Sequence, residues 1–419
     1  MNNKPIQSEK LPPGWNWVKL HDMCQFIRGV SFGGADFNYI YLSDHIPILR
    51  AGNINGSLKL NEDLIWIPSK FVSQEQILQI GDIVICMSSG SPSVVGKTAQ
   101  LKEKWNGSVG AFCGIIRSRD SNWSDYLGYW FRSLMYFDWR NEQTRGANIQ
   151  NLRFSQFEKI LFPLPPLDEQ KRIVKILEEK LAAVEKAKKA AEEKLQAANT
   201  LKQSYLDQIF NEEKLKKSLP KKWKLVKMGE ICEINPRRQI ERDDNKLTSF
   251  VPMECVDETK GTITRSIQRP FKEIKKGYTY FQESDILFAK ITPCMQNGKH
   301  AIAENLTDGI GFGTTEFHVL RPLASVIPQW IHFFLRRKET LSEAEKHFTG
   351  AVGQQRVPKD FLANLSILLP PIGEQKQITK NLSHQFEKTD KLTEKIQDEL
   401  ELINKLPQSY LKQAFEGKL

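Results

Sequence analysis

The sequence predicts an α+β protein in which two pseudo-symmetric globular domains are joined by two long antiparallel coiled-coil helices. Three observations lead to this fold class. The sequence repeats itself once, each copy opens with a mixed pattern of short strands and helices, and each copy closes with a long, narrow apolar stripe of helical period. The chain therefore carries out its function in two related places.

The repeat consists of five segments that return in the same order roughly 205 residues later. The best match is Leu164-Pro165-Pro166-Leu167-Asp168-Glu169-Gln170-Lys171 against Leu369-Pro370-Pro371-Ile372-Gly373-Glu374-Gln375-Lys376. A constant order and a nearly constant offset exclude a chance similarity. The matched segments are 11–19 with 219–227, 81–85 with 284–288, 126–132 with 330–336, 164–171 with 369–376, and 204–210 with 409–415.

The repeat divides the chain into two globular domains, 1–163 and 215–369, each followed by a spacer helix, 164–214 and 370–419. Each domain is long enough to bury its own core. In the first domain the pattern predicts strands at 46–49, 82–86 and 114–116 and at least one helix, from 123 to about 135. In the second it predicts a matching helix at 327–345.

A Pro-Pro step precedes each long helical pattern, where proline ends a strand and pre-sets the chain for helix entry. The segment 168–210 has no Gly or Pro, and as a helix it would span roughly 60 Å. Its heptad positions are apolar except for two lysines, which is the seam of a coiled coil: Val174, Leu177, Leu181, Val184, Lys188, Ala191, Leu195, Ala198, Lys202, Tyr205 and Ile209. In the second helix we expect a kink at Pro407.

An isolated helix of this length cannot bury its apolar stripe, so each one needs a partner. The simplest partner is the other copy, in an antiparallel pair with a globular domain at each end. The alternative is that each helix binds a separate protein. The residues expected at the helix-pair or subunit interface are Leu177, Leu181, Val184, Leu195, Tyr205, Leu382, Phe386, Ile396, Ile403 and Tyr410.

The composition favours a cytoplasmic protein with a polyanionic partner. The formal net charge is +10, which suits nucleic acid, although a merely basic soluble protein would have the same charge. The sequence has no apolar run long enough for a membrane span and no signal peptide. The six cysteines are single, without Cys-x-x-Cys spacing, so we expect reduced thiols rather than disulfides or a zinc site.

No catalytic centre is visible in the sequence. The segment Gly90–Thr98 ends in Gly-Lys-Thr like a phosphate-binding loop, but five residues separate its glycines where that loop has four. The second copy has no such ending at 291–300. The histidines have neither metal-ligand spacing nor a paired nucleophile.

Several of these motifs together resemble the specificity subunit of type I restriction–modification systems, over essentially the whole chain. The most specific element is the Pro-Pro-x-x-Glu-Gln step, which occurs at 165–170 and at 370–375. The Leu-Pro-x-x-Trp opening, the Gly-Asp-Ile-Val strand and the segment Gly110-Ala111-Phe112-Cys113-Gly114 also match. The loop after the strand differs between the copies, with Ser88-Ser89-Gly90-Ser91 in the first and Ile291-Thr292-Pro293 in the second.

This resemblance implies that the globular units are target recognition domains, each reading one half of a bipartite DNA sequence. It implies that the helices fix the gap between the half-sites and dock two modification subunits. Restriction subunits would join the complex as nuclease and translocase. The chain itself would be non-catalytic and bind no cofactor, with S-adenosylmethionine, ATP and Mg²⁺ on its partners, which methylate adenine at N6 and cleave DNA.

Base reading in the major groove requires arginine for guanine and asparagine or glutamine for adenine, on loops that protrude. We take the candidates from loops that are equivalent in the two copies. In the first domain they are Arg28, Ser88, Ser89, Ser91, Lys97, Arg145, Asn148, Gln150 and Asn151. In the second they are Arg237, Arg238, Lys290, Gln296, Asn297, Lys299, Gln354, Gln355 and Arg356.

Two other functions remain open from the sequence. One is a coiled-coil scaffold without sequence-specific DNA binding, and the other is a nucleotide-binding enzyme that uses Gly90–Thr98. Steep loss of duplex DNA binding with salt would separate DNA reading from the scaffold. ATP binding by the isolated chain would support the enzyme.

Overall fold

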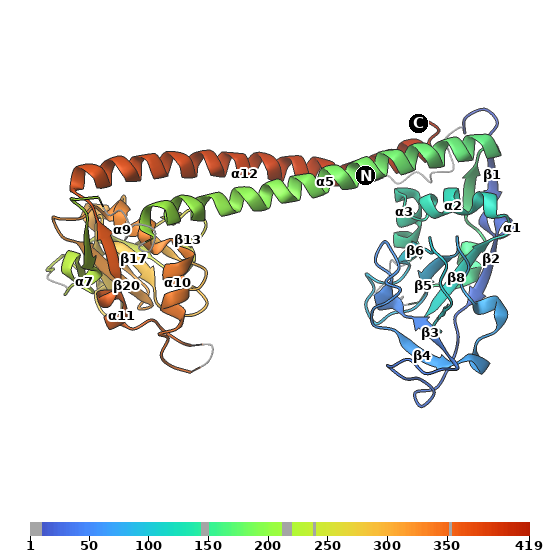
Figure 1. The fold of residues 1–419 in the computed structure, drawn as a ribbon, viewed down its shortest axis with the longest axis horizontal. Coiled ribbons are helices and arrows are strands. Elements are labelled where there is room, and N and C mark those ends of the chain that lie inside the picture. The colour runs from blue at the N-terminus through green and yellow to red at the C-terminus, as the bar shows by residue number, and fades with distance from the viewer. Residues whose placement is uncertain (1–10, 144–150, 212–219, 238–239, 352–353) are drawn as a thin grey trace. The chain divides into compact units, whose positions relative to one another are not determined.

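Two long helices, α5 (Leu167–Phe210) and α12 (Ile372–Phe415), each follow a globular domain (Figure 1). The computed structural model describes residues 11–143, 151–211, 220–237, 240–351 and 354–419. The chain forms two units, one reaching to Ala191 together with Glu399–Leu419, the other Glu192–Asp398. Domain 1 denotes the globular part of the first unit, from β1 to β9. Domain 2 denotes that of the second, from β10 to β21.

In its described residues, domain 1 contains three small sheets and four short helices. Its main sheet has the order β2-β8-β5-β6, a second has the order β4-β3-β7, and β1 pairs with β9. The strands are β1 (Asn16–Lys19), β2 (Cys24–Arg28), β3 (His45–Leu49), β4 (Ile65–Pro68), β5 (Ile83–Cys86), β6 (Thr98–Gln100), β7 (Ser108–Val109), β8 (Cys113–Ser118) and β9 (Leu161–Leu164). The helices are α1 (Leu20–Met23), α2 (Ser124–Trp130), α3 (Leu134–Gln143) and α4 (Phe154–Phe157), with 3₁₀ turns at Ala51–Asn53, Ser69–Phe71, Gln74–Gln76 and Ser121–Trp123.

Domain 2 repeats this plan with a larger second sheet. Its main sheet has the order β11-β20-β17-β18, and the second has the order β15-β12-β19-β16. Two further sheets have two strands each, β10 with β21 and β13 with β14. The strands are β10 (Lys224–Lys227), β11 (Cys232–Ile234), β12 (Leu247–Val251), β13 (Val256–Asp257), β14 (Thr262–Ile263), β15 (Ile267–Pro270), β16 (Thr279–Gln282), β17 (Ile286–Ala289), β18 (His300–Ile302), β19 (Ile310–Gly313), β20 (Phe317–Pro322) and β21 (Ser366–Leu369). The helices are α7 (Met228–Ile231), α8 (Phe271–Ile274), α9 (Pro328–Leu335), α10 (Lys338–Glu345) and α11 (Lys359–Asn364), with 3₁₀ turns at Met253–Cys255 and Thr307–Gly309.

The strands expected at 46–49, 82–86 and 114–116 are present as β3, β5 and β8. The helix expected at 123–135 is wrong, because α2 ends at Trp130 and α3 begins at Leu134. The Ser133 hydroxyl donates to the Trp130 carbonyl at 2.7 Å and so takes an acceptor that a continuing helix would use.

The single helix expected at 327–345 is wrong for a similar reason. The backbone turns to an extended conformation at Arg337, between α9 and α10. The Lys338 amide, which begins α10, donates to the side-chain oxygen of Gln203 on α5 at 3.0 Å. A tertiary partner that the local pattern does not contain therefore caps the second helix.

A buried aspartate–arginine pair stabilises the main sheet of each domain in the same way. In domain 1, Arg117 donates to both oxygens of Asp82 at 2.8 and 2.7 Å. In domain 2, Arg321 donates to both oxygens of Asp285 at 2.9 and 2.7 Å. The carboxylates are buried, so removal of either arginine would leave an uncompensated charge in the core.

The Pro-Pro-x-x-Glu-Gln motif forms the turn from the last strand into each long helix. The Gln170 amide nitrogen donates to the Pro165 carbonyl at 2.8 Å, and that of Gln375 donates to the Pro370 carbonyl at 2.8 Å. Both glutamines are buried. Each glutamine thus donates a hydrogen bond to a carbonyl that has no backbone donor in the turn. The same requirement at both turns explains why the motif occurs twice.

The long helices run antiparallel and bury the expected stripe. In the first unit Leu177 and Leu181 share a core with Leu411 and Phe415, and in the second unit Phe210 shares one with Leu382. Of the ten residues expected at the interface, Leu177, Leu181, Val184, Leu382, Phe386, Ile396 and Ile403 are buried, and Leu195, Tyr205 and Tyr410 are half-buried.

Two details of the helices differ from the sequence pattern. Near the end of α5 the fully buried residues are Leu206 and Phe210, one position after the heptad residues Tyr205 and Ile209. A straight helix drifts away from a strict seven-residue repeat, and here the last turns pack on domain 2 as well as on α12. In α12 the helix continues through Pro407 to Phe415.

The last turns of the two helices dock on the domains by matching contacts. The Gln203 side chain of α5 donates to the carbonyl of Arg336 at 3.0 Å, and Gln408 of α12 donates to that of Arg132 at 3.0 Å. The ring centroids of Phe210 and Trp330 lie 4.6 Å apart, and those of Phe415 and Tyr126 lie 5.2 Å apart. The helix that leaves each domain therefore completes the core of the other domain.

We expect Phe415→Ala to lower the free energy of unfolding of the first unit by about 3–5 kcal/mol, because it removes a buried ring from that core. Leu402→Ala is the matched control on the same helix, since Leu402 is 64% exposed, and should change stability by less than about 0.5 kcal/mol. Urea unfolding followed by intrinsic fluorescence measures both. Equal effects of the two variants would contradict the proposed docking of the helix end.

Candidate nucleic-acid interface

In domain 1, three backbone hydrogen bonds bring the predicted reading loops together. The amides of Met87 and Ser88 donate to the carbonyl of Phe112 at 2.8 and 3.0 Å, and the amide of Leu152 donates to the carbonyl of Met87 at 2.7 Å. Ser88 also forms a β-bridge with Asn151. The loop after β5, the turn before β8 and the segment before α4 therefore lie together at one end of the two central strands of the main sheet.

Domain 2 contains the same arrangement. The Lys290 amide donates to the carbonyl of Glu316 at 2.9 Å, and the Val357 amide donates to the carbonyl of Lys290 at 2.9 Å. Ile291 forms a β-bridge with Arg356. We call this set of bonds the reading frame of each domain.

The reading frame gives a residue-by-residue correspondence between the two domains. Met87 corresponds to Lys290, Ser88 to Ile291, Phe112 to Glu316 and Asn151 to Arg356, because each pair makes the same backbone contact. Lys97 corresponds to Lys299, since their carbonyls accept the amides of Cys86 and Ala289 at 2.9 Å. The backbone is thus conserved between the copies while the side chains at its surface differ.

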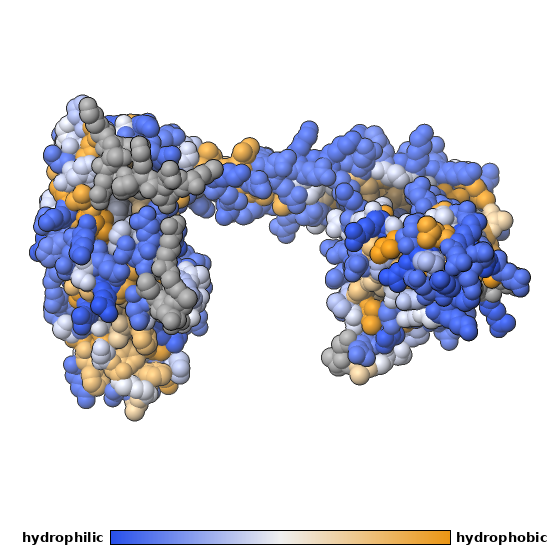
Figure 2. Space-filling view, turned by 180° about the vertical axis from the view of Figure 1, so that it is seen from behind, coloured by the Kyte–Doolittle hydropathy of each residue, from blue (hydrophilic) through white to orange (hydrophobic). Residues whose placement is uncertain are grey.

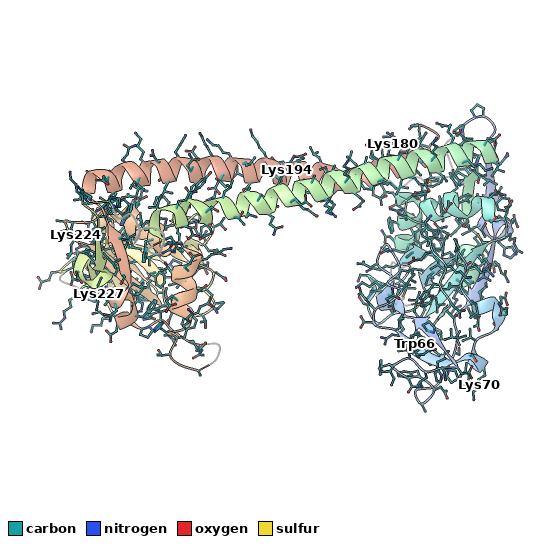
Figure 3. The ribbon with its side chains drawn as sticks, viewed as in Figure 1. Trp66, Lys70, Lys180, Lys194, Lys224 and Lys227 are labelled. Carbon is teal, nitrogen blue, oxygen red and sulfur yellow. The ribbon has the colours of Figure 1, made fainter. Side chains whose placement is uncertain are left out.

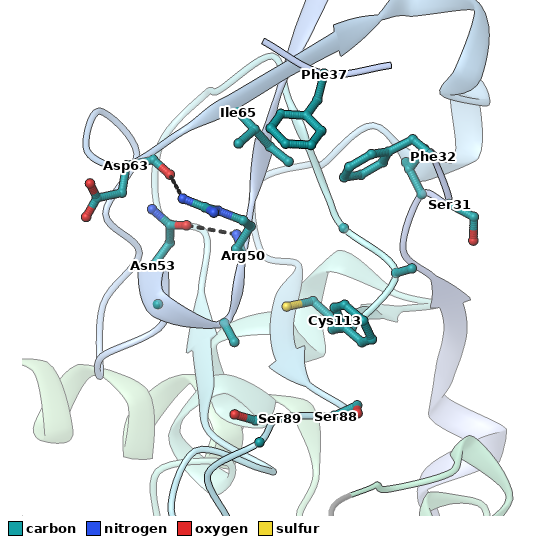
Figure 4. A pocket seen from close by; sticks show the side chains of 17 residues that line it. Ser31, Phe32, Phe37, Arg50, Asn53, Asp63, Ile65, Ser88, Ser89 and Cys113 are labelled. Carbon is teal, nitrogen blue, oxygen red and sulfur yellow. Dashed lines mark hydrogen bonds between the residues drawn. The ribbon is translucent and has the colours of Figure 1, made fainter. Parts of the chain in front are cut away.

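A cavity of about 810 Å³ adjoins the reading frame of domain 1 (Figure 4). The predicted residues Ser88 and Ser89 line it, together with the aromatic rings of Phe32, Phe37 and Phe112. The Arg50 guanidinium also lines it and donates to the carbonyl of Asp63 at 2.9 Å. A cavity with aromatic walls and hydroxyl groups can accept a flat, partly apolar ligand group.

The remaining candidates of domain 1 lie around this frame. Ser91 and Asn151 are exposed, and Lys97 is half-buried. The exposed Arg28 ends β2, where it pairs with Gly114 of β8. Arg145, Asn148 and Gln150 lie outside the described residues.

In domain 2 a carboxylate orients the arginine of the reading frame. Arg356 donates through Nε and Nη2 to the two oxygens of Glu316 at 2.9 Å each, and through Nη1 to the carbonyl of Gln354 at 2.9 Å. These bonds hold the pKa of the Glu316 carboxyl below its usual value. They leave one N–H on each terminal nitrogen of Arg356, which is the pair of donors that a guanine edge accepts.

The other candidates of domain 2 do not all belong to this surface. Gln296, Asn297 and Gln354 are exposed, while Lys290 and Gln355 are half-buried. The Lys299 ammonium instead lies against β13, where it donates to the carbonyl of Val256 at 3.0 Å and pairs with Glu258 at 3.3 Å. Lys299 therefore stabilises its own domain.

Arg237 lies exposed beside a hollow of about 620 Å³, which Lys359 and Arg321 also line. This hollow connects to the reading frame through His318, whose ring nitrogens contact the Asn235 side chain at 3.0 Å and the Val357 carbonyl at 2.8 Å. Arg238 lies outside the described residues.

The sequence did not single out Phe112 or Glu316 as site residues. Phe112 is 70% exposed, which is unusual for a phenylalanine, but its exposure cannot be read from a segment of small residues. Glu316 carries the charge opposite to the one expected for a DNA surface. The correspondence with the first copy, Phe112 against Glu316, is visible only once the hydrogen bonds are known.

The segment Gly90–Thr98 is not a phosphate-binding loop. It runs from β5 into β6, a strand, whereas a phosphate loop leads into a helix whose N-terminal amides bind the phosphates. Gly96 has a φ of +76°, and a side chain there would meet Arg140 at 2.6 Å, so this glycine is required by the turn.

Within the described residues, no group of three or more His, Cys, Asp or Glu side chains is arranged to hold a metal ion. Burial raises the pKa of the Cys24 and Cys232 thiols to about 12, so these two cysteines are core residues rather than nucleophiles. None of the helices in the described part of the chain is long and apolar enough to cross a membrane.

Comparisons with known proteins agree with the repeat and with the fold. The family model of the type I restriction modification DNA specificity domain matches twice, over residues 12–194 and 220–402. The EcoKI specificity subunit of Escherichia coli (strain K12) is 27% identical over 99% of this chain and 91% of that protein. The StySPI specificity subunit of Salmonella potsdam is 29% identical over 98% of this chain and 90% of that protein.

Two solved structures share the fold. One is a chain from a structure described as the basis of complex assembly and conformational transition of the type I R-M system. It has a TM-score of 0.75 and 20% identity, over 98% of this chain and 100% of that chain. The other is the HsdS subunit of Thermoanaerobacter tengcongensis, with a TM-score of 0.61 and 20% identity, over 98% of this chain and 99% of that chain.

These comparisons confirm the family resemblance and the fold class that the sequence predicted, and they give no support to the scaffold or nucleotide-binding functions. These relatives are specificity subunits of type I restriction enzymes. Because the family model matches both halves of the chain, this protein belongs to the type I restriction–modification DNA specificity family, and it supplies DNA sequence specificity.

Proposed function

We propose that each domain reads one half-site of a bipartite DNA target and that the two helices set the distance between the half-sites. The observation that carries this proposal is the shared reading frame, in which the same backbone bonds present different side chains. Phe112 and Asn151 in domain 1 correspond to Glu316 and Arg356 in domain 2. A shared backbone arrangement with different surface side chains suits a DNA target whose two half-sites differ in sequence.

The partners in this proposal are double-stranded DNA, two modification subunits and restriction subunits, in the cytoplasm of a prokaryotic cell. S-adenosylmethionine, ATP and Mg²⁺ would bind to those partners, which would carry out adenine-N6 methylation and DNA cleavage. The chain itself would bind DNA and position the catalytic subunits.

Lysines on both units support contact with the DNA backbone (Figure 3). Lys224 and Lys227 are exposed on β10, and Lys70 is exposed near Trp66 in domain 1. On α5, Lys194 is exposed, and the Lys180 ammonium lies 4.6 Å from the centre of the Tyr410 ring. Such side chains position a duplex without reading its sequence.

The faces of the long helices that point away from the seam support docking of the modification subunits. They carry exposed large apolar side chains, Leu201 at 37%, Leu392 at 45% and Leu402 at 64%. These side chains are available to a protein that binds along the helices.

We expect expression of this chain with its neighbouring modification subunit to create a new bipartite methyladenine motif, two short half-sites around a fixed gap. Long-read sequencing of the host genome measures it. If a demonstrably assembled complex creates no new motif, the proposed function is wrong and the scaffold function gains support.

We expect a one-heptad insertion after Ala190 of α5, matched by one after Asp398 of α12, to lengthen the gap and leave both half-sites unchanged. Both residues are exposed, and a whole heptad preserves the seam. The methylation motif of the variant measures the outcome. An insertion of three residues at the same sites is the control, because it breaks the seam. A changed half-site sequence would refute a spacing role for the helices.

We expect Arg356→Lys to weaken discrimination at one base pair of one half-site by roughly 5- to 150-fold, since lysine cannot donate two parallel hydrogen bonds to guanine. Competition binding of the assembled methyltransferase with duplexes changed at single positions measures this. Arg265→Lys is the control, because Arg265 is exposed between β14 and β15. A uniform loss over all sequences would show that Arg356 contacts phosphate instead.

A further inference from the structure

The backbone of Phe112 forms part of the reading frame, while its side chain lies outside the core. Its carbonyl accepts the amides of Met87 and Ser88 at 2.8 and 3.0 Å, so the turn before β8 is fixed against the loop after β5. The phenyl ring is nevertheless 70% exposed. Every other described phenylalanine of domain 1 is buried or half-buried. An exposed ring that is fixed on an ordered turn is available for contact with a ligand.

The surroundings of the ring are apolar on one side and polar on the other. Phe112 lines the 810 Å³ cavity with Phe32, Phe37 and Ile65, and the hydroxyl side chains of Ser88 and Ser89 line it as well. One terminal nitrogen of the Arg50 guanidinium donates to the Asp63 carbonyl. Figure 2 shows that apolar residues gather on the surface of domain 1 at the end away from the long helices. The aromatic and aliphatic part of this lining can accept an apolar ligand group beside Phe112.

The major groove of DNA offers one apolar group, the 5-methyl of thymine. Adenine, guanine and cytosine present donors and acceptors at this edge, which a phenyl ring cannot satisfy and would desolvate at a cost. A phenyl ring beside an apolar wall therefore selects for a thymine and against a cytosine at the same place.

The second domain supports this assignment by contrast. Glu316 occupies the position of Phe112, and it is engaged by both donors of Arg356 at 2.9 Å. The same backbone position thus carries an apolar side chain, Phe112, in domain 1. In domain 2 it carries Glu316, which orients the proposed guanine-binding Arg356. Two domains built for different half-sites are expected to differ at this position.

We propose that Phe112 is a specificity-determining residue of domain 1 and that it recognises the 5-methyl group of a thymine in the half-site, through its ring and the apolar wall of the adjoining cavity. This inference rests on the proposed function, because it assumes that the reading frame of domain 1 contacts base edges.

The test replaces each thymine of the two half-sites, one at a time, by deoxyuridine, which lacks only the methyl group. The assembled methyltransferase is used, with the motif found by methylation sequencing, at one fixed salt concentration. We expect one deoxyuridine in one half-site to weaken binding by roughly 4-fold, the value of one buried methyl group. Phe112→Ala should bind the thymine and deoxyuridine duplexes equally.

Two further variants make the result specific. Tyr39→Ala is the matched control, since Tyr39 is also 70% exposed and does not line the cavity, and it should keep the 4-fold difference. Phe112→Leu should keep part of it, because leucine is also apolar. Arg356→Lys identifies the half-site of domain 2, which must be the other one.

Three outcomes would overturn the inference. They are a domain 1 half-site without thymine, a deoxyuridine effect that persists in Phe112→Ala, and an effect in the half-site that Arg356→Lys alters. Phe112 could instead insert between base pairs as a wedge, in which case Phe112→Ala weakens binding equally with thymine and with deoxyuridine. Failure of the proposed function is distinct, because the complex would then have no bipartite motif in which to make the substitution.

Discussion

The structure depends on the contact between the last turn of each long helix and a globular domain. Phe210 packs on Trp330 at 4.6 Å, and Phe415 packs on Tyr126 at 5.2 Å. Neither α2 nor α9 could bury its aromatic face without the helix that covers it, and neither long helix could end stably in water with an exposed ring. Each half of the chain thus needs the other half for a complete core, which accounts for the exact duplication of the helix as well as of the domain.

The buried contacts that support the candidate site are shared by the two domains, whereas the side chains at its surface differ between them. The Asp82–Arg117 and Asp285–Arg321 pairs and the backbone bonds of the reading frame are the same in both copies. The side chains above them, Phe112 and Asn151 against Glu316 and Arg356, contribute little to the core. Such residues can change without loss of the fold. A family built in this way can acquire a new DNA target by substitution at a few surface positions.

The sequence predicted the features that depend on local pattern or on repetition. The duplication, the strands β3, β5 and β8 and the apolar seam of α5 follow from spacing alone. It could not predict the break after Trp130, which depends on the Ser133 hydroxyl, or the cap of α10 by Gln203. Lys299 was a candidate because its loop has an equivalent in the first copy, and its contacts with Glu258 and the Val256 carbonyl could not be foreseen from the sequence. The exposure of Phe112 could not be foreseen either, because exposure is a property of the fold.

The most direct test of the account is a cryo-electron microscopy structure of the assembled methyltransferase on its target duplex. The account predicts that the reading frames of the two domains lie in the major groove at different half-sites, with Phe112 at the bases of one and Arg356 at the bases of the other. A complex in which these two residues face solvent, or contact only phosphates, would contradict it.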